Sequence, residues 1–403
     1  MSLIPFSAAK AMLLDSARPI EDIEEVDTAL AFGRALARDI VSPMTVPPFA
    51  NAAMDGYALR AADVPAAGTR LPVSQRVAAG EVAAPLAPGS AARIFTGAQV
   101  PDGADTIVMQ EYCTADGSDV VIDLVPTAGE WVRPAGFDLQ RGKQILAAGS
   151  RLSAAALGLA ASVGIAQLPV FRRLRVAIFF TGSELTVPGQ ALAPGHIYNS
   201  NRYIMRGFLD DLGAEIIDLG IIRDDREATR AALREAAARA DVIVTSGGMS
   251  EGDEDHVTAA VRSEGRIDVW KIASKPGKPL AFGAVRHGTR EAAFIGLPGN
   301  PVSVWAGMLA LVSPFLRRCQ GYSRIEPEMQ RLRADFSYTV KGNRMEFVRV
   351  RRNEGGGLDI YPTQDSAIIS SAVWADGLTP IAAGSSVSPG DQVDFMPGPA
   401  WRP

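Results

Sequence analysis

The stretch Asp241 to His256, "DVIVTSGGMSEGDEDH", decides the fold class. After Asp241, residues Val242–Val244 form an apolar, β-branched run that is typical of a buried strand. The next twelve hold three glycines and four carboxylates, and a helical pattern begins near residue 254. A buried strand that leads through a polar loop into a helix is the repeating unit of a parallel α/β sheet.

The same alternation of strand and helix runs through residues 175–322. The pattern predicts strands at Val176–Phe180, Ala214–Leu219, Val242–Thr245, Val269–Ala273, Leu280–Val285 and Ala293–Leu297. It predicts helices at about 201–212, 226–239, 254–263 and 301–318. We therefore expect a central three-layer α/β domain, in which a mainly parallel sheet is covered on both faces.

The sequence pattern of the flanking regions differs from this alternation of strand and helix. Residues 1–150 should form an N-terminal region with helices at 7–17 and 28–38 and a β-rich module at 66–150. The apolar runs in that module are short and point to antiparallel strands at Ala92–Phe95, Thr106–Met109 and Val120–Leu124. A connecting helix and linker should occupy 151–174, and 323–403 should form a small β domain with strands at Met345–Val350 and Gln392–Phe395.

Composition limits the classes of function. A net charge of -5 on 403 residues gives no reason to expect nucleic acid. Cys113 and Cys319 lie far apart without CxxC spacing, which suggests neither a disulfide framework nor a zinc site and fits a reduced, cytoplasmic compartment. The N-terminus lacks a signal-peptide pattern. The uncharged stretch 152–171 is rich in Ala and Gly, so we expect a short buried helix, capped by Ser153 and stopped at Gly164, rather than a membrane span.

Every loop with unusual chemistry follows a predicted strand of the central domain. These loops are Thr181–Glu184, Arg223–Asp225, Ser246–Gly248, Lys275–Pro279 and Leu297–Pro301. The connections at the opposite edge, such as Ala240-Asp241, are bland. Because ligands of open α/β sheets bind at the carboxyl ends of the strands, this asymmetry predicts a site at that edge.

The residues of these loops suit a phosphorylated ligand and a metal ion. Lys275 and Lys278 are two ammonium groups in a proline-stiffened loop, and the backbone N–H groups of Gly299 and Asn300 open a helix. The nearby carboxylates would repel a phosphate unless Mg²⁺ lay between them. They are Asp224, Asp225, Asp253 and Asp255.

Each loop also has a purely structural explanation. Asn300 before Pro301 is an ordinary helix start, and Gly247 and Gly248 suit any tight turn. The acids 253–255 would complement the dipole of the following helix.

A second interpretation is an α/β-hydrolase. Gly248-Met-Ser-Glu-Gly252 matches the G-x-S-x-G nucleophile elbow between a strand and a helix. That fold needs a histidine downstream. His256 is too close to Ser250 along the chain, and His287 lies in a probable hairpin turn, "RHGT". The elbow also leaves Lys275 and Lys278 unexplained, and neither GxGxxG nor GxxxxGK[ST] occurs.

With these residues assembled, the chain resembles a known family. "TSGGMSEGDEDH", "KPGKP" and "GLPGNPVS" resemble the molybdopterin-binding domain of molybdenum-cofactor biosynthesis proteins. "VPPFANAAMDGYALR" (46–60), "RIFTGAQVPDGADTIVMQE" (93–111) and "GFDLQRG" (136–142) are similar to signatures of the molybdopterin molybdenumtransferases, which include MoeA-type proteins and the E domain of gephyrin.

The resemblance implies a Mg²⁺-dependent transferase. Molybdate enters adenylylated molybdopterin, and the adenylate bond is hydrolysed with release of AMP. It implies a homodimer with composite sites, in which Asp55, Thr96 and Asp138 of one subunit face Lys275 and Lys278 of the other. Other molybdenum-cofactor proteins would be further partners.

The resemblance also implies the roles of individual residues. The candidate catalytic residues are Asp55, Thr96, Asp138, Glu184, Lys275 and Lys278. The candidate substrate contacts are Gly247, Gly248, Ser250, Asp253, Pro298, Gly299, Asn300, Arg349 and Ser371. The candidate metal ligands are Asp224 and Asp255, with Glu184.

Several positions depart from the family pattern. Ala50 and Ala52 replace polar residues, Phe137 replaces an acid, and Glu251 replaces an aliphatic residue. Asp365 stands where glycine is usual. A non-catalytic scaffold with the same fold is the alternative class, but retained Asp55, Thr96, Glu184, Asp255 and Lys275 favour the enzyme. The sequence does not distinguish molybdate from tungstate.

Overall fold

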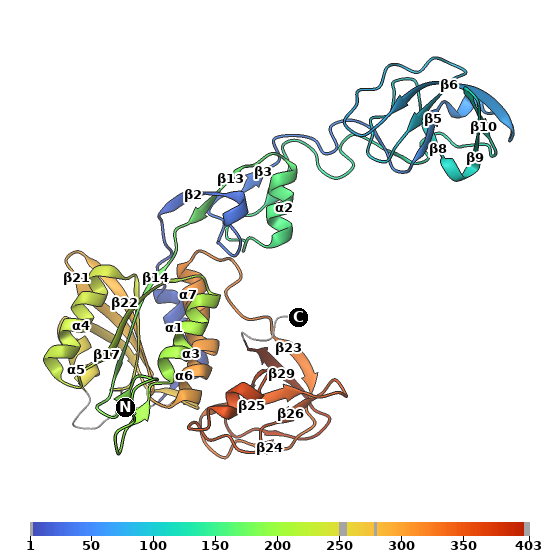
Figure 1. Cartoon of the computed structure of the whole chain (residues 1–403). Coiled ribbons are helices and arrows are strands. Elements are labelled where there is room, and N and C mark those ends of the chain that lie inside the picture. Colours follow the sequence, from blue (N-terminus) through green and yellow to red (C-terminus); the bar gives the residue numbers. More distant parts are fainter. Residues whose placement is uncertain (1–2, 250–255, 278–279, 399–403) are drawn as a thin grey trace. The chain divides into compact units, whose positions relative to one another are not determined.

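The chain forms two compact units. The computed structural model describes residues 3–249, 256–277 and 280–398. The main unit comprises Met1–Arg38, Ala148–Ser153 and Gln167–Pro403, whereas the inserted unit comprises Asp39–Ala147 and Ala154–Ala166. Figure 1 shows the chain, with many of its elements labelled.

The main unit contains the predicted, mainly parallel sheet. Its strand order is β17-β14-β18-β22-β21-β19, and the first four strands of this order run parallel. β21 runs antiparallel to both β22 and β19. The strands are β14 (Arg175–Thr181), β17 (Glu215–Ile222), β18 (Val242–Ser246), β19 (Gly265–Trp270), β21 (Ala281–His287) and β22 (Arg290–Leu297).

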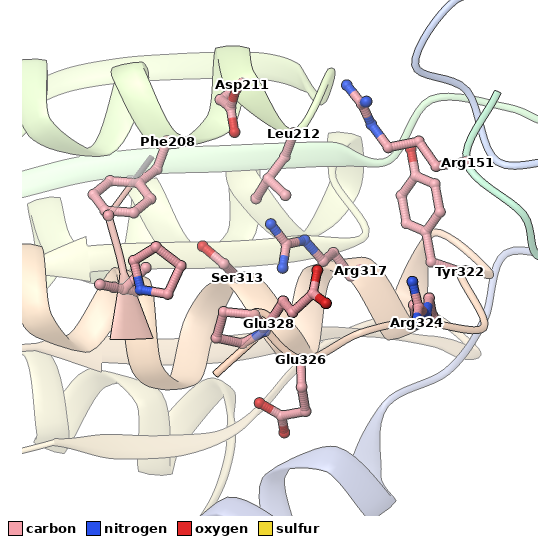
Figure 2. Close-up of a pocket in the computed structure, with 14 residues that line it drawn as sticks. Arg151, Phe208, Asp211, Leu212, Ser313, Arg317, Tyr322, Arg324, Glu326 and Glu328 are labelled. Atoms are coloured by element: carbon pink, nitrogen blue, oxygen red, sulfur yellow. The ribbon is translucent and has the colours of Figure 1, made fainter. Parts of the chain in front are cut away.

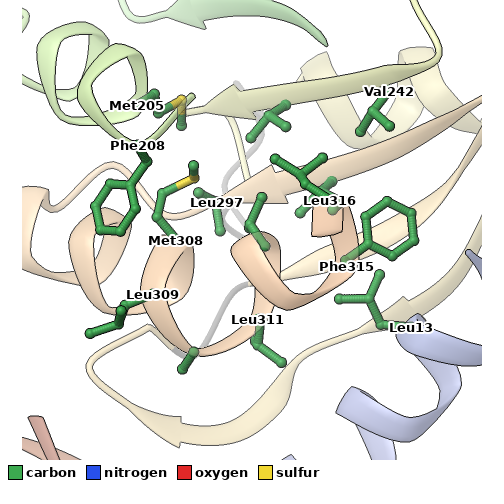
Figure 3. Packing of buried hydrophobic residues seen from close by; sticks show 14 of the residues in the cluster. Leu13, Met205, Phe208, Val242, Leu297, Met308, Leu309, Leu311, Phe315 and Leu316 are labelled. Atoms are coloured by element: carbon green, nitrogen blue, oxygen red, sulfur yellow. The ribbon is translucent and has the colours of Figure 1, made fainter. Parts of the chain in front are cut away.

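Helices cover both faces of this sheet, as expected. Alternate residues of β14 serve different layers, since Ile178 and Phe180 join one core while Ala177 and Phe179 join the other. Figure 3 shows Met205 and Phe208 beside Met308 in the first core. That face carries α1 (Phe6–Ser16), α3 (Asn201–Asp211), α6 (Pro301–Gly307), η4 (Met308–Val312) and α7 (Ser313–Cys319). The other face carries α4 (Arg226–Arg239) and α5 (His256–Glu264).

The helix predicted at 301–318 has an irregular middle. Residues Met308–Val312 form a π-helical segment between two α-helical ones. Pro314 follows this segment and has no backbone N–H to donate to the preceding turn. We attribute the wider turn to that missing donor, because π segments occur where the regular ladder is interrupted.

The strand predicted at 269–273 is wrong as a single element. Lys271 has a φ of 72°, which turns the chain out of the central sheet after β19. The next strand, β20 (Ile272–Lys275), instead pairs in parallel with β1 (Ile4–Pro5) and with β25 (Met345–Arg352). The loop that begins at Lys275 therefore follows a strand of the C-terminal sheet and not of the central one.

That second sheet joins residues from three regions of the sequence. Its order is β1-β20-β25-β27-β29-β23, with β26 beside β25. Its remaining strands are β23 (Gln330–Arg333), β26 (Leu358–Ile360), β27 (Gly377–Ile381) and β29 (Gln392–Pro397). The helix α8 (Ser370–Trp374) and the ribbon of β24 (Tyr338–Thr339) and β28 (Ser386–Val387) complete this region.

The helix predicted at 28–38 is also wrong. Only Thr28–Leu30 is helical, as one 3₁₀ turn capped by the Asp27 carboxylate at 2.8 Å from the Ala29 N–H. Gly33 has a φ of 76°, and its N–H donates to the carbonyl of Leu152. Long-range pairing thus replaces the local helix. Beside it, β2 (Ile23–Asp27) pairs with β13 (Gln167–Phe171).

The inserted unit is β-rich. Its main sheet has the order β8-β5-β7-β6-β10-β9, and all pairs are antiparallel except β6 with β7, which differs from the expectation. These strands are β5 (Gly56–Leu59), β6 (Thr69–Val77), β7 (Ala91–Ile94), β8 (Thr106–Met109), β9 (Cys113–Asp116) and β10 (Asp119–Ile122). Two ribbons pair β3 (Ile40–Val41) with β12 (Gln144–Leu146) and β4 (Asn51–Ala52) with β11 (Val132–Arg133).

The uncharged stretch after residue 152 forms the short helix α2 (Ala154–Ser162). The chain turns away near Gly164, whose φ is 79°, as expected of a helix stop. Only Ala160 of this helix is buried, so the expectation of a buried helix is wrong. Among the described residues, no helix is both long and apolar enough to cross a membrane.

Candidate active site

Side-chain hydrogen bonds tie together the loops at the carboxyl edge of the central sheet. The Ser246 hydroxyl, at the end of β18, donates to the Pro298 carbonyl at 2.9 Å. The Asn201 amide donates to the Ser246 hydroxyl at 2.9 Å and to the Gly299 carbonyl at 2.7 Å. The loop after β22 is therefore fixed against the end of β18. Sequence reasoning missed Asn201, and its only signal was an asparagine at the start of a helix.

Gly247 and Gly248 have conformations that other residues rarely adopt. Their φ angles are 96° and 61°. A Cβ at Gly247 would lie 2.4 Å from the carbonyl oxygen of Thr181, and one at Gly248 would lie 2.5 Å from Val257. The Thr181 hydroxyl beneath Gly248 is buried and has no hydrogen-bond partner within the described ranges. The turn thus brings backbone close to a polar group that a ligand could satisfy.

The candidate metal ligands lie on loops after neighbouring strands. Glu184 follows β14 and is exposed. Its carboxylate lies close to Gly182, because a Cβ on that glycine would be 2.7 Å from a carboxylate oxygen of Glu184. Asp224 follows β17 and is partly buried. Its neighbour Asp225 caps α4, and its carboxylate accepts a hydrogen bond from the Ala228 N–H at 2.8 Å, which gives Asp225 a structural role.

The donor chemistry of these two loops fits Mg²⁺ in part. Carboxylate oxygens are its preferred protein ligands, and Glu184 and Asp224 leave the sheet at the same edge. No group of three potential ligands is present in the part of the chain that the structure describes. Asp255, the remaining candidate, lies outside that part.

Hydrogen-bonding groups at the start of α6 already have partners in the C-terminal region. Asn300 occupies the N-cap position with Pro301 following it, but its side chain makes no cap hydrogen bond. Its amide instead donates to the Ser366 hydroxyl at 2.8 Å, and the Val302 N–H donates to the Ser366 carbonyl at 3.1 Å. Gly299 and Asn300 are exposed, whereas Pro298 is buried.

Lys275 belongs to a small polar cluster of the C-terminal sheet. Its ammonium nitrogen lies 3.3 Å from both carboxylate oxygens of Glu346, which also accept a 2.5 Å hydrogen bond from the Tyr338 hydroxyl. Burial, and then the bond to Glu346, raise the pKa of Tyr338, so this phenol stays protonated. The cluster faces a cavity of about 510 Å³ that Tyr361 and Asp365 also line. Sequence reasoning missed Glu346 and Tyr338.

Arg349 and Ser371 lie inside the C-terminal region, and both are 0% exposed. The Arg349 guanidinium donates to the carbonyls of residues 363, 364 and 365 at 3.0, 3.3 and 3.0 Å. It also donates to the Ser371 hydroxyl at 3.0 Å, and that hydroxyl donates to the Ile368 carbonyl at 2.6 Å. Burial lowers the pKa of Arg349. In this structure, Arg349 holds the segment 363–365, which lines the cavity beside Lys275.

Asp55 and Thr96 form a pair in the inserted unit. The Asp55 carboxylate accepts from both the Thr96 hydroxyl, at 2.7 Å, and the Thr96 N–H, at 2.8 Å. These bonds, the hydroxyl first, hold the pKa of Asp55 below its ordinary value. Asp138 lies in the same unit and is exposed, and its N–H donates to the Val46 carbonyl. The structure thus brings Asp55 and Thr96 together, and no described contact links them to Asp138.

Four candidate residues lie outside the described ranges: Ser250, Asp253, Asp255 and Lys278. The histidine of the hydrolase interpretation can nevertheless be placed. His287 pairs with Arg290 in the hairpin between β21 and β22 and is exposed, which confirms that it is a hairpin residue. His256 begins α5.

Comparison with protein families accounts for almost the whole chain. Residues 4–164 match the MoeA N-terminal region (domain I and II). Residues 177–318 match a probable molybdopterin binding domain, and residues 331–397 match the MoeA C-terminal region (domain IV). The fold and the order of these matches define a multidomain protein built around a molybdopterin-binding domain.

Individual relatives specify the family. The chain is 34% identical over 403 residues to the molybdopterin molybdenumtransferase of Synechococcus elongatus, covering 96% of this chain and 98% of the relative. It is 36% identical over 321 residues to that of Haemophilus influenzae, covering 79% and 78%. A crystal structure of the molybdopterin biosynthesis MoeA protein from Pyrococcus horikoshii has a TM-score of 0.81 at 32% identity, covering 98% and 99%. The chain belongs to the MoeA family of molybdopterin molybdenumtransferases.

Proposed function

We propose that this protein inserts molybdate into adenylylated molybdopterin and releases AMP. The observation that supports this most strongly is the match of all three MoeA regions, in order, to relatives that bear the name molybdopterin molybdenumtransferase. The candidate residues at the loop ends suit the two anionic substrates. A scaffold without catalysis would have no need of the Asp55–Thr96 pair or of Lys275.

The chain's own residues have distinct parts in this proposal. Lys275 supplies positive charge to phosphate or molybdate oxygens as charge develops on them. Glu346 holds its ammonium group at 3.3 Å before the substrate arrives. Arg349 and Ser371 keep the wall 363–365 in place. Direct contact of these two residues with the oxyanion remains a prediction.

Mg²⁺ is part of the proposal. Glu184 and Asp224 would hold it together with Asp255, and the bound ion would neutralise charge on the phosphate oxygens. The turn at Gly247 and Gly248 would allow the substrate to approach the backbone closely.

We also propose a homodimer with composite sites, a cytoplasmic location and transfer of the product to other molybdenum-cofactor proteins. Asp55 and Lys275 belong to separate compact units, which is compatible with contributions from different subunits. Asp55→Asn and Lys275→Ala should each be nearly inactive. Mixed dimers that exchange at random should regain about a quarter of the wild-type activity, because each mixed dimer has one intact site. Confirmed exchange without recovery would place both groups in one chain.

The decisive experiment measures AMP release from adenylylated molybdopterin in the presence of Mg²⁺ and molybdate or tungstate. The wild type should release AMP only when the oxyanion is present. Lys275→Ala should lose most of this activity, whereas the exposed-strand control Arg286→Gln should keep it. Binding of the substrate without AMP release, with either oxyanion, would favour the scaffold.

A further inference from the structure

Two further cavities lie side by side in the main unit. None of the residues assigned to the reaction lines either of them. The larger, of about 400 Å³, lies between α3, α7 and the segment 324–328 (Figure 2). The smaller, of about 300 Å³, shares with it the residues Arg151, Asp211, Leu212 and Tyr322. Cavities of this combined size accommodate small organic ligands.

Arginines surround Tyr322 where the two cavities meet. The Tyr322 hydroxyl donates to the Gly33 carbonyl at 2.6 Å. Burial raises the pKa of Tyr322, while four nearby guanidinium groups oppose that rise. They belong to Arg151, Arg317, Arg34 and Arg173.

Three arginines line the larger cavity. Among the described residues, no carboxylate lies within ion-pair distance of Arg151, Arg317 or Arg324. Within the described part of the chain, the Arg317 guanidinium donates to the Ile325 carbonyl, at 3.3 Å. Its pKa is lowered, first by burial and then by the charge of Arg151, while Tyr322 and Glu326 oppose this lowering in part. Partial burial of a cation such as Arg317 beside a like charge is unfavourable unless an anion compensates it.

A hydroxyl in the same cavity also lacks a partner. Ser313 lines the cavity and is 4% exposed, and its oxygen makes no hydrogen bond to any residue within the described ranges. Ser313 lies one helical turn before Arg317, so the two side chains share one face of α7. Figure 2 shows both between α3 and the segment that carries Glu326.

The acids that line this cavity, Asp211, Glu326 and Glu328, offset the charge of the arginines only in part. Glu326 pairs with Lys10 at 2.6 Å, and both Glu326 and Glu328 are exposed. The rest of the wall is largely apolar and includes Phe208, Leu309 and Pro327. The cavity therefore combines several cationic donors with a surface for an organic group.

We propose that this cavity is a binding site for a tetrahedral phosphate group, either free phosphate or the head of a small organic phosphomonoester. Phosphate carries two charges and four acceptor oxygens, which suits several guanidinium groups and a hydroxyl better than a carboxylate would. The apolar wall would contact the organic part of a phosphomonoester. The site is separate from the residues of the proposed reaction, and it stands if that reaction is wrong.

The test is titration calorimetry of the full chain with inorganic phosphate and with phenyl phosphate, at constant ionic strength. Arg151 is exposed, so Arg151→Gln should fold normally and bind about tenfold more weakly. Ser313→Ala removes a hydroxyl without a partner, so it should weaken binding several-fold without lowering stability. The charge-matched control Arg286→Gln should bind like the wild type. Tighter binding of phenyl phosphate indicates an organic ligand, and equal affinities indicate free phosphate.

Other outcomes would overturn the proposal. Lys275→Ala must retain the binding, because phosphate held by the reaction site would be lost in that variant. Absence of binding by the wild type at millimolar phosphate would refute it. So would binding that neither Arg151→Gln nor Ser313→Ala weakens, or a change of oligomeric state in these variants in place of a change in affinity.

Discussion

Replacement of Arg349 by methionine should release the cavity wall beside Lys275. The guanidinium makes four hydrogen bonds of 3.0 to 3.3 Å, three of them to consecutive backbone carbonyls. Each bond from a charged donor contributes about 1 kcal/mol or more, so their joint loss should cost roughly 4 to 6 kcal/mol. Methionine fills much of the same volume, and its burial carries no desolvation cost of a charge. This difference should offset about 1 to 2 kcal/mol of that loss. The expected net loss of local stability is about 2 to 5 kcal/mol.

Hydrogen exchange measures this loss in the region concerned, which suits a chain of several domains better than a global unfolding curve. Peptides that cover 345–352 and 361–371 should exchange faster in Arg349→Met, and those covering β14 should not change. Arg349→Lys is the matched control. It keeps the charge but lacks the planar fork, so it should lose about half as much stability.

The same variants separate two roles of Arg349. If it holds the wall, AMP release should fall in step with the protection of 361–371 across the two variants. Lost AMP release with unchanged protection would refute this reasoning and show that Arg349 acts directly on the oxyanion.

Three further predictions follow from single contacts. Thr96→Val should raise the pKa of Asp55 towards its ordinary value, and a carboxyl NMR titration would measure this change. Because the pKa of Asp55 is lowered in the folded protein, its carboxylate stabilises the fold at pH values above the ordinary pKa. This contribution is lost as the pH falls through the folded pKa. Glu346→Gln should lower the free energy of unfolding by only about 1 kcal/mol, because Lys275 is 43% exposed and solvent screens its pair with Glu346. The same variant should slow AMP release, because the Lys275 ammonium group is no longer held in place. Unchanged turnover would count against a positioning role for Glu346. Gly247→Ala should cost about 2 kcal/mol or more in chemical denaturation, because its Cβ would lie 2.4 Å from a carbonyl oxygen, and an unchanged midpoint would contradict the turn geometry.

The sequence predicted the elements whose causes are local. Val176–Phe180 and Val242–Val244 are apolar over their whole length, as buried parallel strands require, and both lie in strands of the central sheet. The loops after these strands were found for the same reason, because parallel strands end at a common edge. The motifs around Asp55 and Thr96 indicated the family, and the two residues indeed form a pair.

Only the tertiary structure decided how distant segments pair. Nothing in the local pattern of 269–273 shows that the chain leaves the central sheet at Lys271 and continues in a strand beside Ile4 and Met345. The partners of Lys275 and Arg349 lie 71 and 14 to 22 residues away, so no spacing rule relates them. Periodicity records which face of an element is buried, because that is a property of each segment. Strand partners, buried ion pairs and cavities depend on which segments meet, and that follows from the packing of the whole chain.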